Sequence, residues 1–157
     1  MAVVSTSSGK PAIPAEPRTV DDLRRMWPGT ALEAFGLILV GVDEDRLVLE
    51  MPIRPELRQP MGFLHGGVHL FLAESAASLH ACVGVDLQKT SPVGIEVNGS
   101  HLRPVREGTV RAVAEVIRRS TTTIVHQIAI SHVESGQQLC VCRVTNLYRS
   151  ATAGNTE

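Results

Sequence analysis

Residues 58–81, RQPMGFLHGGVHLFLAESAASLHA, contain the segment that decides the fold. From about residue 67 to residue 82, small or apolar side chains occur at nearly every angle of a helical wheel. A helix with this pattern is buried nearly all round. Its many Ala and Ser residues also let a sheet pack closely against it. The sequence therefore predicts one long buried helix inside a curled sheet.

The segments around this helix have the composition of strands. Two β-rich runs, residues 31–45 and 46–53, meet at the turn sequence DED and predict a hairpin. Four more β-type runs follow near residues 91–102, 108–119, 122–133 and 138–149. They are separated by the short turn sequences VREG, RRST and ESGQQ.

A short first helix is predicted before the hairpin. Thr19 is a candidate N-cap, Asp21 and Asp22 suit the first turn, and the helix should stop before Pro28. One long helix among about six strands with short connections indicates an antiparallel sheet, because parallel strands need long crossovers. The predicted class is α+β, with the sheet wrapped around the helix.

Length and composition limit the choice of function. The chain has 157 residues, 43% hydrophobic, which suits one globular domain, expected over residues 18–150 between flexible tails at 1–17 and 151–157. A net charge of −1 and 3% aromatic residues argue against a nucleic-acid partner. No segment resembles a signal peptide or a membrane span. We therefore expect a cytoplasmic protein without a membrane partner.

Glu74 is the unusual residue of the long helix. A buried carboxylate costs several kcal/mol unless it is paired or hydrogen-bonded. One interpretation is that Glu74 reaches the helix surface or pairs with Arg58 or Arg106. However, Gly66 lies eight positions before Glu74 and Ser78 four after it, so all three project within about a quarter turn of one another. They define a polar stripe on an otherwise apolar helix.

The paired glycines Gly66 and Gly67 lie at the expected helix start. Backbone N–H groups are unpaired there, the helix dipole is positive, and glycine lets a ligand approach closely. A carbonyl over the Gly66 N–H would be polarised, and Glu74 is a candidate nucleophile or general base for its carbon. The alternative is that the glycines form only a turn before a helix.

Residues 59–78, QPMGFLHGGVHLFLAESAAS, resemble the active-site segment of hotdog-fold acyl-CoA thioesterases, in the branch of the phenylacetate-pathway thioesterase, 1,4-dihydroxy-2-naphthoyl-CoA hydrolase and the Glu-dependent 4-hydroxybenzoyl-CoA thioesterase. The resemblance covers about residues 30–149. It implies that Glu74 is the catalytic carboxylate and that Gly66 donates its N–H to the thioester carbonyl. Gln59 would bind near that carbonyl, Ser78 would hold water, and His65 would assist polarisation or shape the turn.

The resemblance also implies the substrate contacts and the assembly. Arg103 matches a position that contacts CoA phosphates, and Ser120, Thr121 and Thr122 match the neighbourhood of other CoA contacts. Each site would lie at a dimer interface, with Gln59 and Gly66 of one subunit facing Glu74 and Ser78 of the other. Two such dimers would form a tetramer. No cofactor is implied.

Three functions remain open from the sequence. The first is hydrolysis of an acyl-CoA thioester, with an aromatic acyl group as one candidate. The second is a non-catalytic acyl-CoA-binding regulatory protein with the same fold, and the third is a hotdog acyl-CoA hydratase or dehydratase. His69 and His80 lack a partner at metal-ligand spacing, so we interpret them as hydrogen-bonded core or interface residues and expect no metal.

Overall fold

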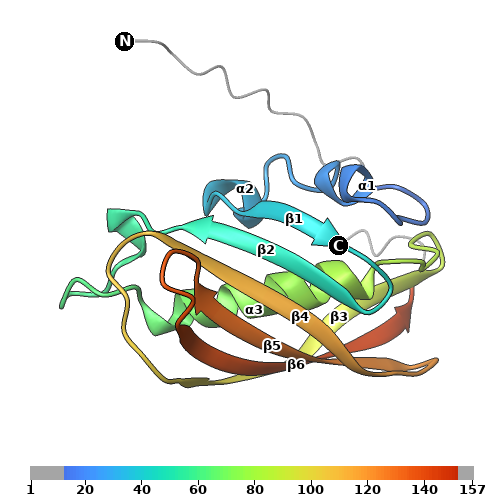
Figure 1. Ribbon diagram of the computed structural model, residues 1–157. Coiled ribbons are helices and arrows are strands. Elements are labelled where there is room, and N and C mark those ends of the chain that lie inside the picture. Colours follow the sequence, from blue (N-terminus) through green and yellow to red (C-terminus); the bar gives the residue numbers. More distant parts are fainter. Residues whose placement is uncertain (1–12, 152–157) are drawn as a thin grey trace, which may run out of the picture.

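The computed structural model describes residues 13–151 of the chain. Six strands form one antiparallel sheet in the order β1-β2-β4-β5-β6-β3, and this sheet curls around a single long helix (Figure 1). The predicted α+β class, with about six strands around one helix, is confirmed. The helices are α1 (Val20–Arg24), α2 (Ala31–Ala34), the 3-10 helix η1 (Pro55–Leu57) and α3 (Gly66–Ala81). The strands are β1 (Ile38–Val42), β2 (Arg46–Pro52), β3 (Thr90–His101), β4 (Thr109–Arg119), β5 (Thr123–His132) and β6 (Gln138–Ser150).

The short first helix begins where its capping residue predicts. The hydroxyl of Thr19 accepts a hydrogen bond from the N–H of Asp22, and the Asp22 carboxylate accepts one from the N–H of Thr19. This reciprocal capping box satisfies two N–H groups that a helix start leaves unpaired. The hairpin of β1 and β2 around the DED turn is also present.

One part of the hairpin prediction is wrong. The run 31–45 is not strand throughout, because Ala31–Ala34 form the short helix α2. Ala, Leu and Glu have high helix propensity. Gly36 then adopts a φ of +70°, a left-handed conformation that commonly follows the end of a helix.

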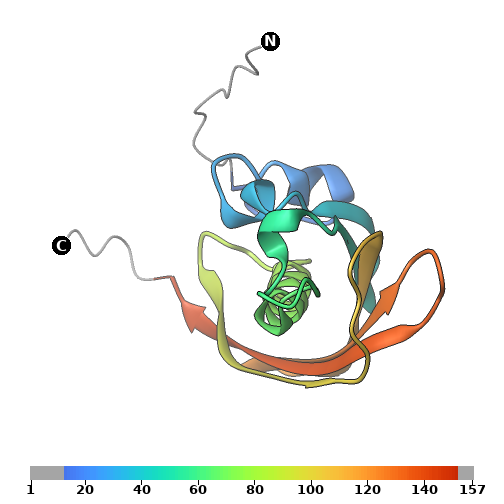
Figure 2. The ribbon, with the colours of Figure 1, turned by 90° about the vertical axis from the view of Figure 1, so that its left-hand side faces the viewer.

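Helix α3 lies inside the curve of the sheet (Figure 2). The side that faces the sheet is buried, and its members are His69, Leu72, Ala73, Ala76, Ala77, Leu79, His80 and Ala81. The other side is not: Gly67 and Glu74 are exposed, and Phe71 and Ser78 are half-buried. The expectation of a helix buried all round is therefore wrong for the single chain, because its own sheet covers only one side.

Strand β3 is an edge of the sheet along 12 residues. Within residues 13–151 it pairs with β6 on one side and with no strand on the other. Val93 is 38% exposed and Ile95 is 56% exposed. The opposite edge, β1, has α1 packed near it. A long, partly apolar edge strand is a surface on which another chain can pair.

The expected flexible tails lie mostly outside the described residues, which exclude 1–12 and 152–157. Within residues 13–17, the carbonyls of Ala15 and Pro17 accept hydrogen bonds from the N–H groups of Leu87 and Gly84. This segment therefore lies along the loop that follows α3. No helix among the described residues is long and apolar enough to cross a membrane.

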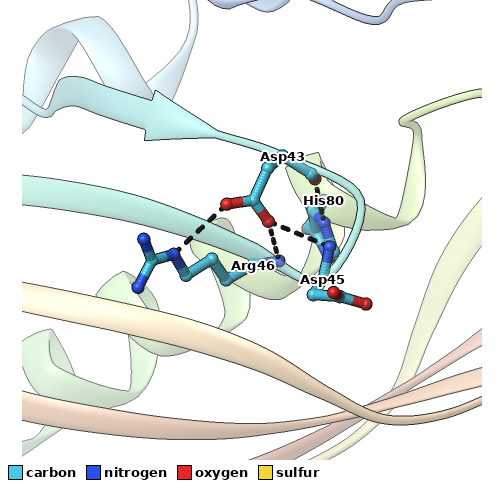
Figure 3. Close-up of polar contacts among 4 residues, drawn as sticks. All are labelled: Asp43, Asp45, Arg46 and His80. Atoms are coloured by element: carbon cyan, nitrogen blue, oxygen red, sulfur yellow. Dashed lines mark hydrogen bonds and ion pairs between the residues drawn. The ribbon is translucent and has the colours of Figure 1, made fainter.

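Two buried histidines tie the end of α3 to the sheet. Nε2 of His80 lies 3.0 Å from the carbonyl oxygen of Asp43, in the β1–β2 turn that Asp43 also closes through Asp45 and Arg46 (Figure 3). A carbonyl only accepts, so this nitrogen carries the hydrogen, and in the neutral ring that burial favours Nδ1 of His80 is an acceptor. It accepts from Nε2 of His126, at 2.8 Å. The Asp43 carbonyl thus fixes the tautomers of the two neutral imidazoles, and the prediction that His80 is a hydrogen-bonded core residue is confirmed.

This histidine pair should make the protein sensitive to acid. Burial lowers the pKa of His126 to about 3 and also lowers the pKa of His80. The unfolded chain takes up these protons near pH 6.5, but the folded chain does not. The free energy of unfolding should therefore fall between about pH 6.5 and pH 4, by about 1.4 kcal/mol per pH unit for His126, and His80 should add to this fall.

Urea unfolding at fixed protein concentration, repeated across this pH range, measures the effect. His126→Gln should make the pH dependence shallower, since the amide does not titrate. Gln127→Ala, at the neighbouring exposed position of β5, is the control and should leave the dependence unchanged. A His126→Gln protein as acid-sensitive as the original would contradict the assignment.

Candidate functional site

The loop before α3 brings Gln59 close to the helix start. The N–H of Gln59 donates to the carbonyl of Phe63, and the N–H of Gly62 donates to the carbonyl of Gln59, both at 2.8 Å. The Gln59 side-chain oxygen accepts from the N–H of Met61. Arg106 holds the loop from outside, with its guanidinium carbon 3.9 Å from the centre of the Phe63 ring. The loop is therefore fixed by contacts at both its ends.

Helix α3 begins directly after this loop. His65 is its N-cap, and Nδ1 of His65 accepts a hydrogen bond of 2.9 Å from the N–H of Gly67. The N–H of Gly66 takes part in none of the hydrogen bonds found within residues 13–151. A donor at the positive end of a 16-residue helix is suited to a carbonyl oxygen that gains negative charge.

A first pocket of about 360 Å³ opens at this place. Gln59 and Gly66 line it together with Phe63, Leu64, His69, His101, Leu102, Arg103 and Pro104. A Cβ atom on Gly66 would lie 2.9 Å from Nε2 of His101, so only glycine lets this ring lie against the helix start. The structure thus brings Gln59 and Gly66 together, as the sequence predicts, and places Arg103 in the same pocket. The exposed His65 caps the same helix.

Glu74 and Ser78 line a second pocket, of about 320 Å³. Its other walls are mostly apolar and are formed by Met26, Leu32, Phe71, Ser75, Leu79, Cys82 and Pro92. Glu74 is exposed on the single chain, so its carboxylate is not buried as the sequence pattern suggested. A carboxylate and a hydroxyl one helical turn apart, beside apolar walls, can bind water next to an apolar substrate.

Two residues that the sequence analysis did not identify position Glu74 and Ser78. Nδ2 of Asn146, on β6 and fully buried, donates to Oγ of Ser78 at 2.9 Å. The hydroxyl hydrogen of Ser78 is therefore free to donate elsewhere. A Cβ atom on Gly94 would lie 2.8 Å from Oε1 of Glu74, so the missing side chain at Gly94 provides the space for the carboxylate. Both residues are distant from α3 in sequence.

The two pockets do not form one centre within a chain. Gly66 and Glu74 are eight residues apart on α3, which corresponds to about 12 Å along the helix axis. A carbonyl held by the Gly66 N–H cannot also contact the Glu74 carboxylate of the same helix. The residues of the predicted site therefore lie in two separate pockets of the chain.

The predicted CoA-binding residues lie in two places. Arg103 lines the first pocket, and its Nη1 donates to the carbonyl of Gln138 at 2.9 Å. Ser120 and Thr121 line a different pocket, with Arg119 and Tyr148. Oγ of Ser120 accepts hydrogen bonds from the N–H groups of Thr122 and Thr123, so this hydroxyl also shapes the β4–β5 turn.

The first pocket also contains a histidine pair. Nδ1 of His69 lies 3.3 Å from Nδ1 of His101, and burial together with the nearby His101 lowers the pKa of His69 to about 4. The prediction of a hydrogen-bonded His69 is confirmed. Its partner could not be found from the sequence, because 32 positions separate the two residues.

Comparison with known families decides the class of protein. The model of the thioesterase superfamily matches residues 61–147, which include Gly66, Glu74 and Ser78. The chain belongs to the thioesterase superfamily. This thioesterase has the hotdog fold, and of the three functions left open by the sequence, thioester hydrolysis is the one its family carries.

Individual relatives agree with this assignment. The thioesterase is 35% identical over 113 residues to 1,4-dihydroxy-2-naphthoyl-CoA hydrolase of Listeria monocytogenes, covering 72% of this chain and 90% of the relative. A mutant of thioesterase PA1618 from Pseudomonas aeruginosa superposes with a TM-score of 0.80 at 31% identity, over 88% of this chain and 99% of the other. Thioesterase HI1161 from Haemophilus influenzae superposes with a TM-score of 0.81 at 30% identity, over 92% and 99%.

Proposed function

We propose that the protein hydrolyses acyl-CoA thioesters to the free acid and CoA, at sites that two chains build together. The observation that carries the proposal is the separation of the two half-sites along α3, one with Gln59 and Gly66 and the other with Glu74 and Ser78. The name of the Listeria relative, a CoA thioester hydrolase, supports CoA as the thiol.

A twofold dimer would join the halves. In an isologous interface, residue i of one chain contacts residue j of the other, and the reverse contact also occurs. Placing Gly66 against Glu74 of the partner subunit then completes two equivalent sites. The unpaired edge of β3, with Val93 and Ile95 exposed, lies beside Glu74 through Gly94 and supports this face as the interface. Two such dimers form the tetramer that the sequence resemblance implies.

The reaction follows from these positions. The thioester carbonyl is held by the N–H of Gly66 and by Gln59, at the positive end of α3, where negative charge on the oxygen is stabilised. Glu74 of the partner subunit either attacks the carbonyl carbon or removes a proton from a water molecule that attacks it. The hydroxyl of Ser78, whose oxygen already accepts from Asn146, donates to that water or to the carboxylate. The carbon–sulfur bond then breaks and CoA leaves as a thiolate.

The two roles of Glu74 differ in the source of the product oxygen. A nucleophilic Glu74 forms an anhydride, which water then hydrolyses; if water attacks the Glu74 carbonyl carbon, the acid keeps a Glu74 oxygen in the first turnover, whereas a general base transfers only oxygen from water. A single turnover in ¹⁸O-labelled water, followed by mass spectrometry of the acid, tests for this oxygen transfer. If the acid from the first turnover contains no ¹⁸O, Glu74 is the nucleophile.

The second pocket is the proposed acyl site. Its apolar walls include Met26, Leu32 and Phe71, and Phe71 packs on Phe35 with ring centres 4.4 Å apart. Aromatic side chains suit stacking against an aromatic acyl group. We therefore place aromatic acyl-CoAs among the substrates, with the carbonyl carbon directed toward Glu74.

A screen of purified protein against aromatic and aliphatic acyl-CoAs, with released thiol detected by a chromogenic disulfide, tests the proposal. CoA release from at least one aromatic acyl-CoA is expected. Hydrolysis of small non-CoA thioesters without turnover of any acyl-CoA would show that the enzyme uses another thiol. An absence of any thioester hydrolysis would contradict the function.

Arg103 is the proposed contact for the CoA phosphates, because a guanidinium group binds phosphate oxygens in pairs. Arg103→Ala should raise KM for acyl-CoA about 10-fold and leave kcat nearly unchanged, as expected when binding is lost equally in the ground state and the transition state. Arg118→Ala, at an exposed position of β4, is the control in the same Michaelis measurements. A fall in kcat at constant KM would assign Arg103 another role.

Gly94 is a proposed positioning residue for Glu74. Gly94→Ala places a Cβ atom 2.8 Å from the carboxylate oxygen and should displace it, lowering kcat by about 10-fold or more with little change in KM. Gly41→Ala on β1, where a Cβ atom meets no atom within 4 Å, is the matched control. If Gly94→Ala acts through Glu74, it should have no further effect in a Glu74→Gln protein. A further loss there would contradict the assignment.

A further inference from the structure

A cluster of three potential metal ligands lies in the first pocket. His69 comes from α3, His101 from β3 and Cys140 from β6, and their ligand atoms all lie within 4.8 Å of one another. His69 and His101 also line the pocket, which gives an ion a path to the cluster. We propose that these three residues bind one divalent cation of the zinc class. This proposal reverses the expectation of no metal drawn from the sequence, where no two of the three ligands are near each other.

The distances suit a tetrahedral ion. With Zn–N bonds of about 2.05 Å, tetrahedral zinc holds two nitrogens about 3.3 Å apart. The Nδ1 atoms of His69 and His101 are 3.3 Å apart. A zinc-bound sulfur lies about 3.6 Å from each nitrogen, so the sulfur of Cys140 must approach by at most about 1.2 Å. Two imidazoles and a thiolate are ligands that zinc prefers over magnesium or calcium, and the fourth position stays open toward the pocket.

The ring nitrogens of His69 are not fully hydrogen-bonded within the described residues. Its side chain is only 3% exposed, and its Nε2 has no hydrogen-bond partner among the described residues. Its Nδ1 has only the contact of 3.3 Å to His101, which is long for a hydrogen bond between nitrogens. An unsatisfied buried polar group costs about 1–3 kcal/mol. Coordination through Nδ1 would replace the long contact with His101, although it would leave Nε2 without a partner.

The pair of His80 and His126 differs from the pair of His69 and His101. His80 and His126 are 2.8 Å apart, and their hydrogen bonds run in one direction to the carbonyl of Asp43. Nδ1 of His126 also has no hydrogen-bond partner among the described residues, but none of the three cysteines joins this pair in a cluster of potential ligands within residues 13–151. The His69 pair has a thiol beside it and a pocket in front of it. Only the His69 pair therefore has the features of a metal site.

The bound cation would block the proposed carbonyl site. The ring of His101 lies against Gly66, so closely that a Cβ atom there would be 2.9 Å from its Nε2. An ion on His69 and His101 would occupy the pocket that Gly66 also lines. The prediction of inhibition rests on the proposed function, but metal binding does not.

Titration of the metal-free full-length protein with Zn²⁺, without substrate, tests binding by calorimetry. One ion per chain is expected. Either His69→Ala or Cys140→Ala should weaken zinc binding by about 100-fold or more. This loss is larger than the one caused by replacing a residue that only hydrogen-bonds to a ligand. His126→Gln and Cys82→Ala are matched controls, since each removes a buried histidine or cysteine outside the cluster, and both should bind normally. Co²⁺ should give a thiolate charge-transfer band that Cys140→Ala abolishes.

Circular dichroism verifies that each variant is folded. If Cys140→Ala does not fold, zinc titration of two separate variants, Cys140→Ser and His69→Ala, tests the proposal instead. Absence of stoichiometric Zn²⁺ binding, or binding unchanged in folded His69→Ala, would overturn the proposal. Zn²⁺ should also inhibit thioester hydrolysis by the original protein and not by His69→Ala. Stoichiometric binding without inhibition would overturn only the link to the carbonyl site.

Discussion

Glu74→Gln is expected to lower kcat for thioester hydrolysis by about 100-fold or more, with little change in the affinity for acyl-CoA. The amide has nearly the shape of the carboxylate but neither attacks a carbonyl nor accepts a proton. A group that acts only in the chemical step is removed, so kcat falls and binding persists. Because Glu74 is exposed on the single chain, the change should not disturb the core.

Stopped-flow or steady-state assays give kcat, and calorimetry with a non-hydrolysable CoA thioether gives the affinity. Glu115→Gln, an exposed carboxylate on β4, is the control for the same chemical change elsewhere. Near-normal turnover in Glu74→Gln would refute the mechanism. Loss of substrate analogue binding with the loss of kcat would assign Glu74 a structural role instead.

The secondary structure followed from local signals. The long helix was predicted from about residue 67 to residue 82 and spans Gly66–Ala81, because the apolar run is continuous and His65 caps its start. The strands followed from β-rich runs between turn residues. The helix Ala31–Ala34 also has a local signal in the sequence, namely a threonine, four helix-favouring residues and a glycine soon after them.

The exposure of α3 could not be read from its sequence. A helical wheel reports that a surface is apolar, but not whether the chain's own sheet or a second chain covers it. The sequence therefore left open whether Glu74 is buried or reaches the helix surface, and in the single chain it is exposed. The sequence of β3 is ambiguous in the same way. Its apolar residues alternate as in a half-buried strand, yet Val93 and Ile95 are exposed in the single chain.

The motif residues of the site were predicted from the sequence, but the residues that position them were not. Gln59, Gly66, Glu74 and Ser78 lie within one continuous stretch, so their spacing is visible in the sequence. Asn146 behind Ser78 and Gly94 beside Glu74 come from other strands. Only the pairing of β3 with β6, and the packing of both on α3, brings such residues to the site.

The central claim is that each site combines Gln59 and Gly66 of one chain with Glu74 and Ser78 of another. Gln59→Ala and Glu74→Ala should each be nearly inactive alone. In a dimer of one chain of each kind, one site carries both changes and the other carries none. With random pairing about half of the dimers are mixed, so activity should return to about a quarter of the original.

Co-expression of the two variants with different affinity tags, followed by sequential purification, isolates the mixed dimers, and native mass spectrometry verifies their composition. The purified mixed dimers should have about half of the original activity per chain, far above the sum of the two variants alone. Mixed dimers of verified composition that remain as inactive as either variant would contradict the shared site, because every site would then keep one defect.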